Sequence, residues 1–374
     1  MRIAERWTDR AAPVRPGEAL DLERLGDYLA REHPALAGEL TVEQFPSGYS
    51  NLTYLVGVRR DDGETREMVL RRPPFGSRVA SAHDMGREYR ILSALEGLYP
   101  KAPRPLFHCA DAEVIGAPFY AMERRRGLIL RGGSPDTAPD PEVMRRVGEA
   151  FVETLAELHA VDYEAAGLAE LGRPRGYVRR QVEGWSERWR RARVDDVEPM
   201  ETAAAWLNDS LSARSGFREA ASLVHNDFKY DNLVLSAEDP GRVDAVLDWE
   251  MATLGDPLMD LGTALGYWTD PDDDPALLAL SLSPTTWPGN PSRREIATRY
   301  LEATGSEARE LVFFYVFGLF KIAVILQQIY YRYRQGLTAD PRFARLDEGV
   351  EALARTAARA IETGRIDRLY AASP

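Results

Sequence analysis

The pattern of hydrophobic and polar positions changes after the first third of the chain. Residues 18–33 alternate apolar and charged positions at helical spacing, which predicts an amphipathic helix. Short segments rich in β-branched and aromatic residues follow at 40–45, 52–58 and 67–71, and turn sequences separate them. This arrangement predicts an antiparallel meander. A helix is expected at 83–98, and two more strands at 105–109 and 117–123.

Beyond Pro141 the pattern is mainly helical, apart from short apolar strand candidates at 233–235 and 243–247. Glycine and proline cluster within 124–141, where we expect the boundary between two parts. The sequence therefore predicts an α+β fold with two lobes: residues 1–123, a small antiparallel sheet with helix, and residues 124–374, a large helical part.

One long apolar run occupies residues 311–326. It is short for a membrane span and contains Lys321, so we predict a buried helix and no membrane partner.

Composition narrows the function classes. The 374 residues carry a net charge of −12, which argues against a nucleic-acid partner. Cys109 is the only cysteine, so no disulfide can form within the chain. The first residues are polar and lack an apolar signal core, and we expect a cytoplasmic protein that is a monomer or a homodimer.

The strongest chemical signal is His225-Asn-Asp-Phe-Lys-Tyr-Asp-Asn232. The spacing His-x-Asp-x-x-x-x-Asn matches the catalytic loop of kinases. Asp227 can accept a hydrogen bond from a substrate hydroxyl and orient it for in-line attack. Asn232 offers an oxygen to Mg²⁺, and Lys229 can neutralise charge on a transferring phosphoryl group.

A second acidic element lies downstream. Asp248 ends an apolar strand, where kinases place the aspartate that bridges Mg²⁺ to the nucleotide phosphates, and Asp260 could brace the catalytic loop. Each residue alone has a plainer interpretation: a core histidine for His225, a turn residue for Asp227, a strand-end cap for Asp248. The order and spacing of the three elements favour the catalytic interpretation.

The first third holds the candidate nucleotide contacts. Between two predicted strands lies a polar loop whose backbone N–H groups could cover phosphates, or which is an ordinary hairpin turn. Arg71 ends the third strand, where it could bind phosphate bidentately, and Arg72 is its rival. Glu88 could pair with Arg71 or be a solvated acid. The adenine ring could form hydrogen bonds with the backbone at the end of the last predicted strand of the first lobe, 117–123. The loop residues are Ser47, Gly48, Tyr49, Ser50 and Asn51, and the adenine candidates are Glu123 and Arg124.

Together these motifs resemble the aminoglycoside phosphotransferase/choline kinase superfamily. More closely, the chain resembles bacterial phosphotransferase-family proteins related to the kinase-like domain of acyl-CoA dehydrogenase family members 10 and 11. The resemblance covers most of the chain, and further matching segments are 69–74, 83–88, 116–120, 158–162, 176–181, 247–250, 255–257 and 320–324. It implies Asp227 as catalytic base, Asn232 and Asp248 as Mg²⁺ ligands and ATP as donor. The wider superfamily often has lysine where this chain has Arg71.

Acceptor candidates stay open at this point. Aromatic residues could line a substrate pocket or pack in the core. A basic cluster after Gly172 would favour an anionic acceptor such as a hydroxy acid or a hydroxyacyl-CoA if it lines the cleft. Acidic residues would be needed for an aminoglycoside, but most of those available look like a surface loop. The aromatic residues are Tyr177, Trp185, Trp249, Tyr267 and Trp268, the arginines are Arg173, Arg175, Arg179 and Arg180, and the acids are Glu250, Asp270, Asp272, Asp273 and Asp274.

Three other classes of function fit the sequence less well than an active small-molecule kinase. A nucleotide-binding pseudokinase is disfavoured because Asp227, Asn232 and Asp248 are all present. A metal hydrolase is disfavoured because the sequence has no second histidine at ligand spacing from His225. A protein kinase is disfavoured because no typical activation segment follows Asp248.

Overall fold

The computed structural model describes residues 7–46, 51–60, 62–75, 84–132, 138–213, 220–280, 282–307, 310–338 and 340–370. Contacts divide the chain into two compact units. The first comprises Met1–Ile129 together with Val234–Glu238 and Asp244–Glu250, and the second comprises Leu130–Leu233, Asp239–Val243 and Met251–Pro374. Two segments from the later half of the chain thus belong to the first unit.

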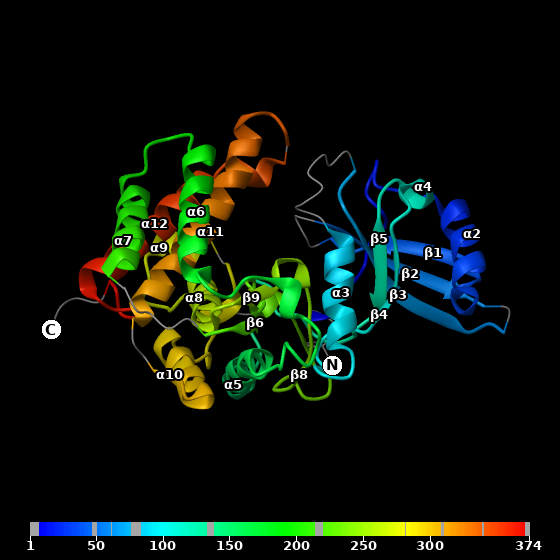
Figure 1. Ribbon diagram of the computed structural model, residues 1–374, viewed down its shortest axis with the longest axis horizontal. Coiled ribbons are helices and arrows are strands. Elements are labelled where there is room, and N and C mark those ends of the chain that lie inside the picture. The colour runs from blue at the N-terminus through cyan, green and yellow to red at the C-terminus, as the bar shows by residue number, and fades with distance from the viewer. Residues whose placement is uncertain are drawn as a thin grey trace. The chain divides into compact units, whose positions relative to one another are not determined.

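The first unit is built on a five-stranded antiparallel sheet with the order β1-β2-β3-β5-β4 (Figure 1). Strands β1, β2 and β3 form the meander that the alternating pattern predicts. The strands are β1 (Glu39–Gln44), β2 (Leu52–Arg59), β3 (Thr65–Arg72), β4 (Pro105–Cys109) and β5 (Phe119–Glu123).

Helices lie on opposite sides of this sheet (Figure 1). One face packs with α2 (Leu22–Glu32) and α4 (Ala112–Ile115), where Leu25 and Leu29 join Tyr54 and Leu70 in a buried cluster. On the other side, α3 (Met85–Leu95) packs against β4 and β5. Because side chains alternate along a strand, consecutive residues of β3 face different helices.

Two helices are shorter than expected. The first begins at Leu22 and ends at Glu32 rather than spanning 18–33, because the side chain of Asp21 accepts the amide of Arg24 and starts the helix there. The second begins at Met85 and ends at Leu95 rather than spanning 83–98, with Asp84 capping it through the amide of Arg87.

The two returning segments are tied to the first unit by backbone hydrogen bonds. Strands β7 (Leu233–Leu235) and β8 (Val243–Val246) pair with each other. Leu128 and Leu235 exchange two backbone hydrogen bonds of 2.8 Å, and the amide of Val246 donates to the carbonyl of Lys101 at 2.8 Å. The backbone that carries Asp248 is therefore anchored in the first unit.

The second unit is mainly helical. It also contains strands β6 (Ser222–Val224) and β9 (Thr253–Gly255), which pair antiparallel and whose three-residue lengths are too short to show a period in the sequence. The helices are α5 (Pro141–His159), α6 (Tyr177–Ala192), α7 (Glu198–Ala213), α8 (Pro257–Tyr267), α9 (Pro275–Ala279), α10 (Arg293–Thr304), α11 (Leu311–Arg334) and α12 (Leu346–Thr363).

Helices α8 and α11 touch through their backbones. A Cβ built on Gly318 would lie 2.0 Å from the carbonyl oxygen of Gly262, and one built on Gly262 would lie 2.1 Å from the carbonyl oxygen of Phe314. No side chain fits at this crossing, so glycine is required at both positions.

Helix α11 is long and apolar enough to cross a membrane by length and composition. However, 72% of its most apolar stretch is buried inside the protein, where it packs against α8, α12, α6 and α7. The helix is the buried core helix that its sequence predicts.

Candidate functional site

In the first unit, Arg71 forms an ion pair with Glu88. Arg71 lies at the end of β3 and donates to the Glu88 carboxylate on α3 at 2.5 Å. The side chains are only 7% and 2% exposed. Burial opposes the charge on Arg71, but the surrounding carboxylates raise its pKa well above the ordinary value, so it stays protonated.

Strand alternation separates Arg71 from its rival Arg72. Arg72 points to the other face of the sheet, where it donates to the carbonyls of Ile115 at 2.6 Å and Pro73 at 3.0 Å. The structure thus pairs Glu88 with Arg71, and Arg72 is a structural residue of the opposite face.

Two further carboxylates reach Arg71 from the returning segment. Its second guanidinium nitrogen lies 2.9 Å from Asp248 and 3.5 Å from Glu250, and the side-chain amide of Asn51 donates to Glu250 at 2.6 Å. Asp248 has φ +67°, a left-handed conformation that aspartate adopts more readily than most residues. Its carboxylate is 35% exposed.

These oxygen donors fit Mg²⁺. The ion usually keeps several waters and takes one or two carboxylates plus nucleotide phosphates, so a full protein cage is not required. Within the described residues there is no cluster of three or more His, Cys, Asp or Glu side chains that could hold a metal alone. Asp248 offers a partly exposed carboxylate for such a shared site.

The other candidate nucleotide contacts are placed only in part. Ser47, Gly48, Tyr49 and Ser50 lie outside the described residues. Glu123 ends β5, and its amide already donates to the carbonyl of Arg104 at 2.9 Å, so an adenine contact would use other backbone groups there. The side chain of Arg124 donates to Glu67 at 2.6 Å.

In the second unit, Asp227, Lys229 and Asn232 lie together on the loop after β6. The Lys229 ammonium contacts both oxygens of Asp227, at 3.1 and 2.9 Å. The side-chain amide of Asn232 donates to the carbonyl and to the carboxylate of Asp227, at 2.8 and 3.0 Å. Because the side-chain nitrogen of Asn232 makes these hydrogen bonds, its side-chain oxygen is the atom that could coordinate a cation.

The Lys229 ammonium group beside Asp227 stays charged at neutral pH. Burial alone would lower the pKa of Lys229, but Tyr267 and Asp227 raise it well above the ordinary value. Burial beside Asp227 also raises the pKa of Tyr267, and the Lys229 ammonium lies 4.8 Å from the centre of its ring. Burial raises the pKa of Asp231 nearby.

The predicted brace at Asp260 is confirmed. This fully buried carboxylate accepts the amides of His225 at 2.6 Å and Asn226 at 2.7 Å, and His159 contacts it at 3.1 Å. Burial would raise the pKa of Asp260, but these hydrogen bonds and the neighbouring histidines lower it. The carboxylate therefore stays ionised and fixes the backbone immediately before Asp227.

Most of the aromatic acceptor candidates pack in the interior. Tyr177 is buried and its hydroxyl donates to Asn226 at 3.0 Å, so it supports the loop rather than lining a pocket. Trp185, Trp249 and Trp268 are also buried. The basic cluster is exposed, and Arg180 donates to the carbonyls of Arg175 and Arg173, so the cluster gives no information on the acceptor.

The acidic stretch after Trp268 was expected to be a surface loop, and for two of its members this is wrong. Asp270 and Asp273 are 4% and 5% exposed and pair with Arg293, which is fully buried. Burial raises the pKa of Asp270 to about 6. Through Arg293, these carboxylates connect the start of α10 to the segment after α8, so their role is structural.

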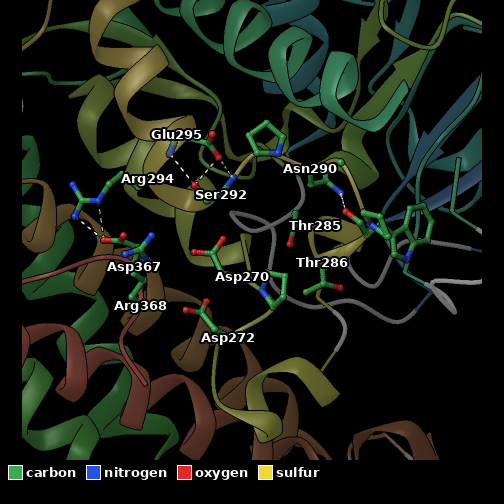
Figure 2. A pocket seen from close by; sticks show the side chains of 15 residues that line it. Asp270, Asp272, Thr285, Thr286, Asn290, Ser292, Arg294, Glu295, Asp367 and Arg368 are labelled. Carbon is green, nitrogen blue, oxygen red and sulfur yellow. Dashed lines mark hydrogen bonds and ion pairs between the residues drawn. The ribbon is translucent and has the colours of Figure 1, made fainter. Parts of the chain in front are cut away.

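Next to this ion cluster lies an open pocket of about 540 Å³ in the second unit (Figure 2). Its labelled side chains include Asp272, Thr286 and Asn290, and an ion pair between Arg294 and Asp367 lies at one side. Asp270 and Asp272, two of the acidic acceptor candidates, line this pocket, whereas the predicted catalytic, nucleotide-binding and metal residues that the structure describes do not.

Sequence reasoning assigned no role to two residues beside the loop. Lys321 donates to the carbonyl of Asn226, the residue before Asp227, at 2.6 Å. The available signal was a lone charge in an apolar run, in a chain with few lysines. Asn226 has φ +67° and occupies the variable position of the His-x-Asp motif, so the motif itself gives no sign of its role.

Comparison with solved structures identifies the class of fold. A crystal structure from Ralstonia eutropha, assigned by name to the aminoglycoside phosphotransferases, superposes with a TM-score of 0.73 at 27% identity over 92% of this chain and 99% of that one. The GDP complex of aminoglycoside 2′-phosphotransferase-IIIa shares the fold, with a TM-score of 0.58 and 16% identity over 90% of this chain and 98% of that one. The protein has a kinase-like α+β fold, with an antiparallel sheet unit and a helical unit.

The chain belongs to the phosphotransferase enzyme family, whose model matches residues 41–296. Among curated proteins it is 35% identical to acyl-CoA dehydrogenase family member 11 of Gallus gallus, over 86% of this chain and 41% of that protein. It is 34% identical to family member 10 of Mus musculus, over 86% of this chain and 29% of that protein. The chain thus spans less than half the length of these relatives. Family and neighbours support a small-molecule kinase.

Proposed function

We propose that the protein transfers the γ-phosphoryl group of ATP, in the presence of Mg²⁺, to a hydroxyl group of a small molecule. The observation that carries the proposal is the arrangement at Asp227. Its carboxylate is 15% exposed and is held by Lys229 and Asn232 on one side, with Asp260 fixing the backbone before it. An oriented, partly exposed carboxylate is suited to bind and deprotonate a hydroxyl group.

In this reaction the acceptor oxygen forms a bond to the γ-phosphorus while the bond from that phosphorus to the bridging oxygen breaks. Asp227 takes the hydroxyl proton, ADP leaves, and a phosphate ester remains. Lys229 would offset the charge of the transferring group. Mg²⁺, held by Asn232 and Asp248 with the phosphates, would supply charge neutralisation on the nucleotide.

The first unit supplies the features expected of a nucleotide site. The Arg71–Glu88 pair corresponds in kind to the buried cation and acid that kinases use to order the phosphates. A guanidinium group can contact two phosphate oxygens at once. The named complexes of related folds with GDP are consistent with a purine nucleotide as donor.

For the acceptor, we propose a hydroxy acid or a hydroxyacyl-CoA. The curated relatives carry acyl-CoA dehydrogenase names, which suggests an acyl compound as the substrate class. An aminoglycoside-type antibiotic kinase is the second candidate, because several solved neighbours carry that name. It is less favoured because Asp270 and Asp273 already neutralise the buried Arg293 and are not available to a cationic sugar.

Release of ADP from Mg-ATP, measured with a panel of hydroxy acids, hydroxyacyl-CoAs and aminoglycosides, tests the proposal. Asp227→Asn should reduce acceptor-dependent turnover by about 10²-fold or more, because an amide cannot accept the proton. Asp209→Asn, which changes an exposed carboxylate on α7 of the same unit, is the matched control and should keep wild-type turnover. Wild-type turnover in Asp227→Asn would refute the assigned base. No transfer to any acceptor, despite nucleotide binding, would favour a nucleotide-binding pseudokinase.

A further inference from the structure

Lys321 is a buried charge that the proposed reaction does not use. It lies in the apolar helix α11 with 1% of its surface exposed. Within the described chain its ammonium makes one hydrogen bond, to the carbonyl of Asn226 at 2.6 Å, and lies 5.8 Å from the centre of the Trp185 ring. Burying an ammonium group without a contact ion pair is costly, and an apolar residue of similar volume would serve the packing better. The fold alone therefore does not account for a lysine here.

Asn226, whose carbonyl accepts the hydrogen bond from Lys321, is held at each of its polar groups. The amide of Asn226 donates to Asp260 at 2.7 Å, and its side-chain nitrogen donates to the carbonyl of Met251 at 3.1 Å. Its side-chain oxygen accepts the hydroxyl of Tyr177 at 3.0 Å. Lys321 completes the set at the carbonyl, and that carbonyl belongs to the peptide bond that joins Asn226 to Asp227.

Asn226 needs this support because its backbone is in the left-handed region, at φ +67°. Asparagine adopts this conformation more readily than most residues, but it is still less favourable than the right-handed region and is stabilised by the groups that hold it. If the Asn226–Asp227 peptide rotated, the carboxylate of Asp227 would turn with it. The orientation of Asp227 thus depends on the group that fixes the Asn226 carbonyl.

We infer that Lys321 is a positioning residue: its ammonium group fixes the Asn226–Asp227 peptide and so aims the carboxylate of Asp227 at the acceptor hydroxyl. This role rests on the proposed phosphotransferase function. Lys321 does not touch substrate or nucleotide in this role. It acts only through the peptide that it binds.

The role has a consequence for pH. Burial lowers the pKa of Lys321 to about 8, with Arg188 on α6 and Lys229 on the loop adding to the lowering, and Asp260 on α8 and Asp227 opposing it. A neutral amine is a weaker donor than an ammonium group, so the hold on the peptide should weaken above pH 8. Lys229 and Tyr267, whose pKa values are raised, stay protonated through this range.

The test compares Lys321→Met with Gln327→Met. Both variants remove a buried donor to a backbone carbonyl from the same helix, since Gln327 donates to Ala192 at 2.9 Å, away from the loop. Hydrogen–deuterium exchange of peptides covering residues 223–229 is measured first, because it needs no turnover. We expect faster exchange there in Lys321→Met and wild-type exchange in Gln327→Met. Unchanged exchange in Lys321→Met would overturn the inference.

The kinetic arm uses ADP release from Mg-ATP, with an acceptor from the panel above or with water as acceptor. In Lys321→Met, kcat should fall by about 10- to 100-fold while the KM for ATP stays unchanged, since misplacement of a reacting group by about 1 Å costs up to that much. Wild-type kcat should decline above pH 8, and the variant should show no such decline. Equal kcat, or the same decline in both proteins, would contradict the role.

The two arms separate the inference from the function on which it rests. If the wild-type protein turns over no substrate but the exchange difference is present, the phosphotransferase proposal fails while the hold of Lys321 on the loop stands. If turnover is normal in both variants, the function stands and the inference fails. Should Lys321→Met not fold, the pH dependence of wild-type exchange at residues 223–229 decides, with an increase beyond the intrinsic rate expected above pH 8.

Discussion

Asp260 and Lys321 hold opposite ends of the same residue. The carboxylate of Asp260 on α8 accepts the amide of Asn226 at 2.7 Å, and the ammonium of Lys321 on α11 donates to its carbonyl at 2.6 Å. The two helices are in direct backbone contact where Gly262 faces Gly318. The separation of these helices therefore sets the conformation of the loop that carries Asp227.

Gly318→Ala should disturb this contact. The added methyl group would lie 2.0 Å from the carbonyl oxygen of Gly262, which cannot move without shifting α8. We expect the free energy of unfolding to fall by at least about 1–3 kcal/mol, as in overpacked cores, and chemical denaturation measures it. Turnover should fall as well, because Asp260 moves with α8.

Gly184→Ala on α6 is the control for that variant. Its new methyl group would meet only the flexible end of Arg188 at 3.3 Å, and alanine is favoured over glycine inside a helix. Stability should stay the same or rise by up to about 1 kcal/mol. If Gly318→Ala behaves in the same way, the two helices are not in the contact described.

Arg71→Met should destabilise the protein in a pH-dependent way. It leaves Glu88, 2% exposed, without its guanidinium partner, and loss of one member of a buried pair costs about 3–5 kcal/mol. Burial already raises the pKa of Glu88, and Arg71 is the main group that lowers it. A carboxyl group with a higher pKa in the folded state binds its proton more tightly when folded, so the loss should be large at pH 7 and shrink toward pH 5.

Arg66→Met on the same strand is the comparison for Arg71→Met. Arg66 is 44% exposed and pairs with Glu64 at 3.3 Å, so its loss should change the free energy of unfolding by less than about 1 kcal/mol at either pH. If the free energy of unfolding of Arg71→Met falls only slightly, or falls equally at both pH values, Arg71 does not stabilise the ionised form of Glu88.

The stability difference between the wild type and Lys321→Met should also vary with pH. The folded-state pKa of Lys321, about 8, is lower than the ordinary lysine value of 10.5, so the unfolded chain holds this proton more tightly. The wild type should therefore gain stability relative to the variant as the pH rises from 8 to 10.5, by about 3 kcal/mol in total. Denaturation of both proteins at pH 7 and pH 10 measures the change. A constant difference would mean that Lys321 is not buried as a charge.

The sequence was sufficient to predict the antiparallel meander and the grouping of the residues in the candidate catalytic loop. The meander at the start follows from period-two alternation and strong turn sequences, and His225, Asp227 and Asn232 are close in the chain, so their grouping needs no long-range information. The brace at Asp260 is a long-range contact, 35 residues from His225, and its prediction came from the order of the motifs rather than from nearness in the chain.

What the sequence could not decide depends on contacts between distant segments. Arg71 and Arg72 are chemically alike, and only the placement of α3 and α4 on opposite faces of the sheet tells them apart. Asp270 and Asp273 looked exposed because charged residues in proline-bounded loops usually are, and their burial requires Arg293, a residue of another helix.

The most direct test of the central claim is thermal stability with a non-hydrolysable ATP analogue, with and without Mg²⁺, in the wild type and in Asp248→Asn. Asparagine tolerates the left-handed backbone at this position but removes the charge that would hold the metal. A ligand at about 100 times its dissociation constant adds about 2.7 kcal/mol, which should raise the wild-type Tm by a few degrees. We predict a Mg²⁺-dependent rise in the wild type that is lost in the variant. No rise in the wild type, or an equal rise in both proteins, would contradict a magnesium–nucleotide site built on Asp248.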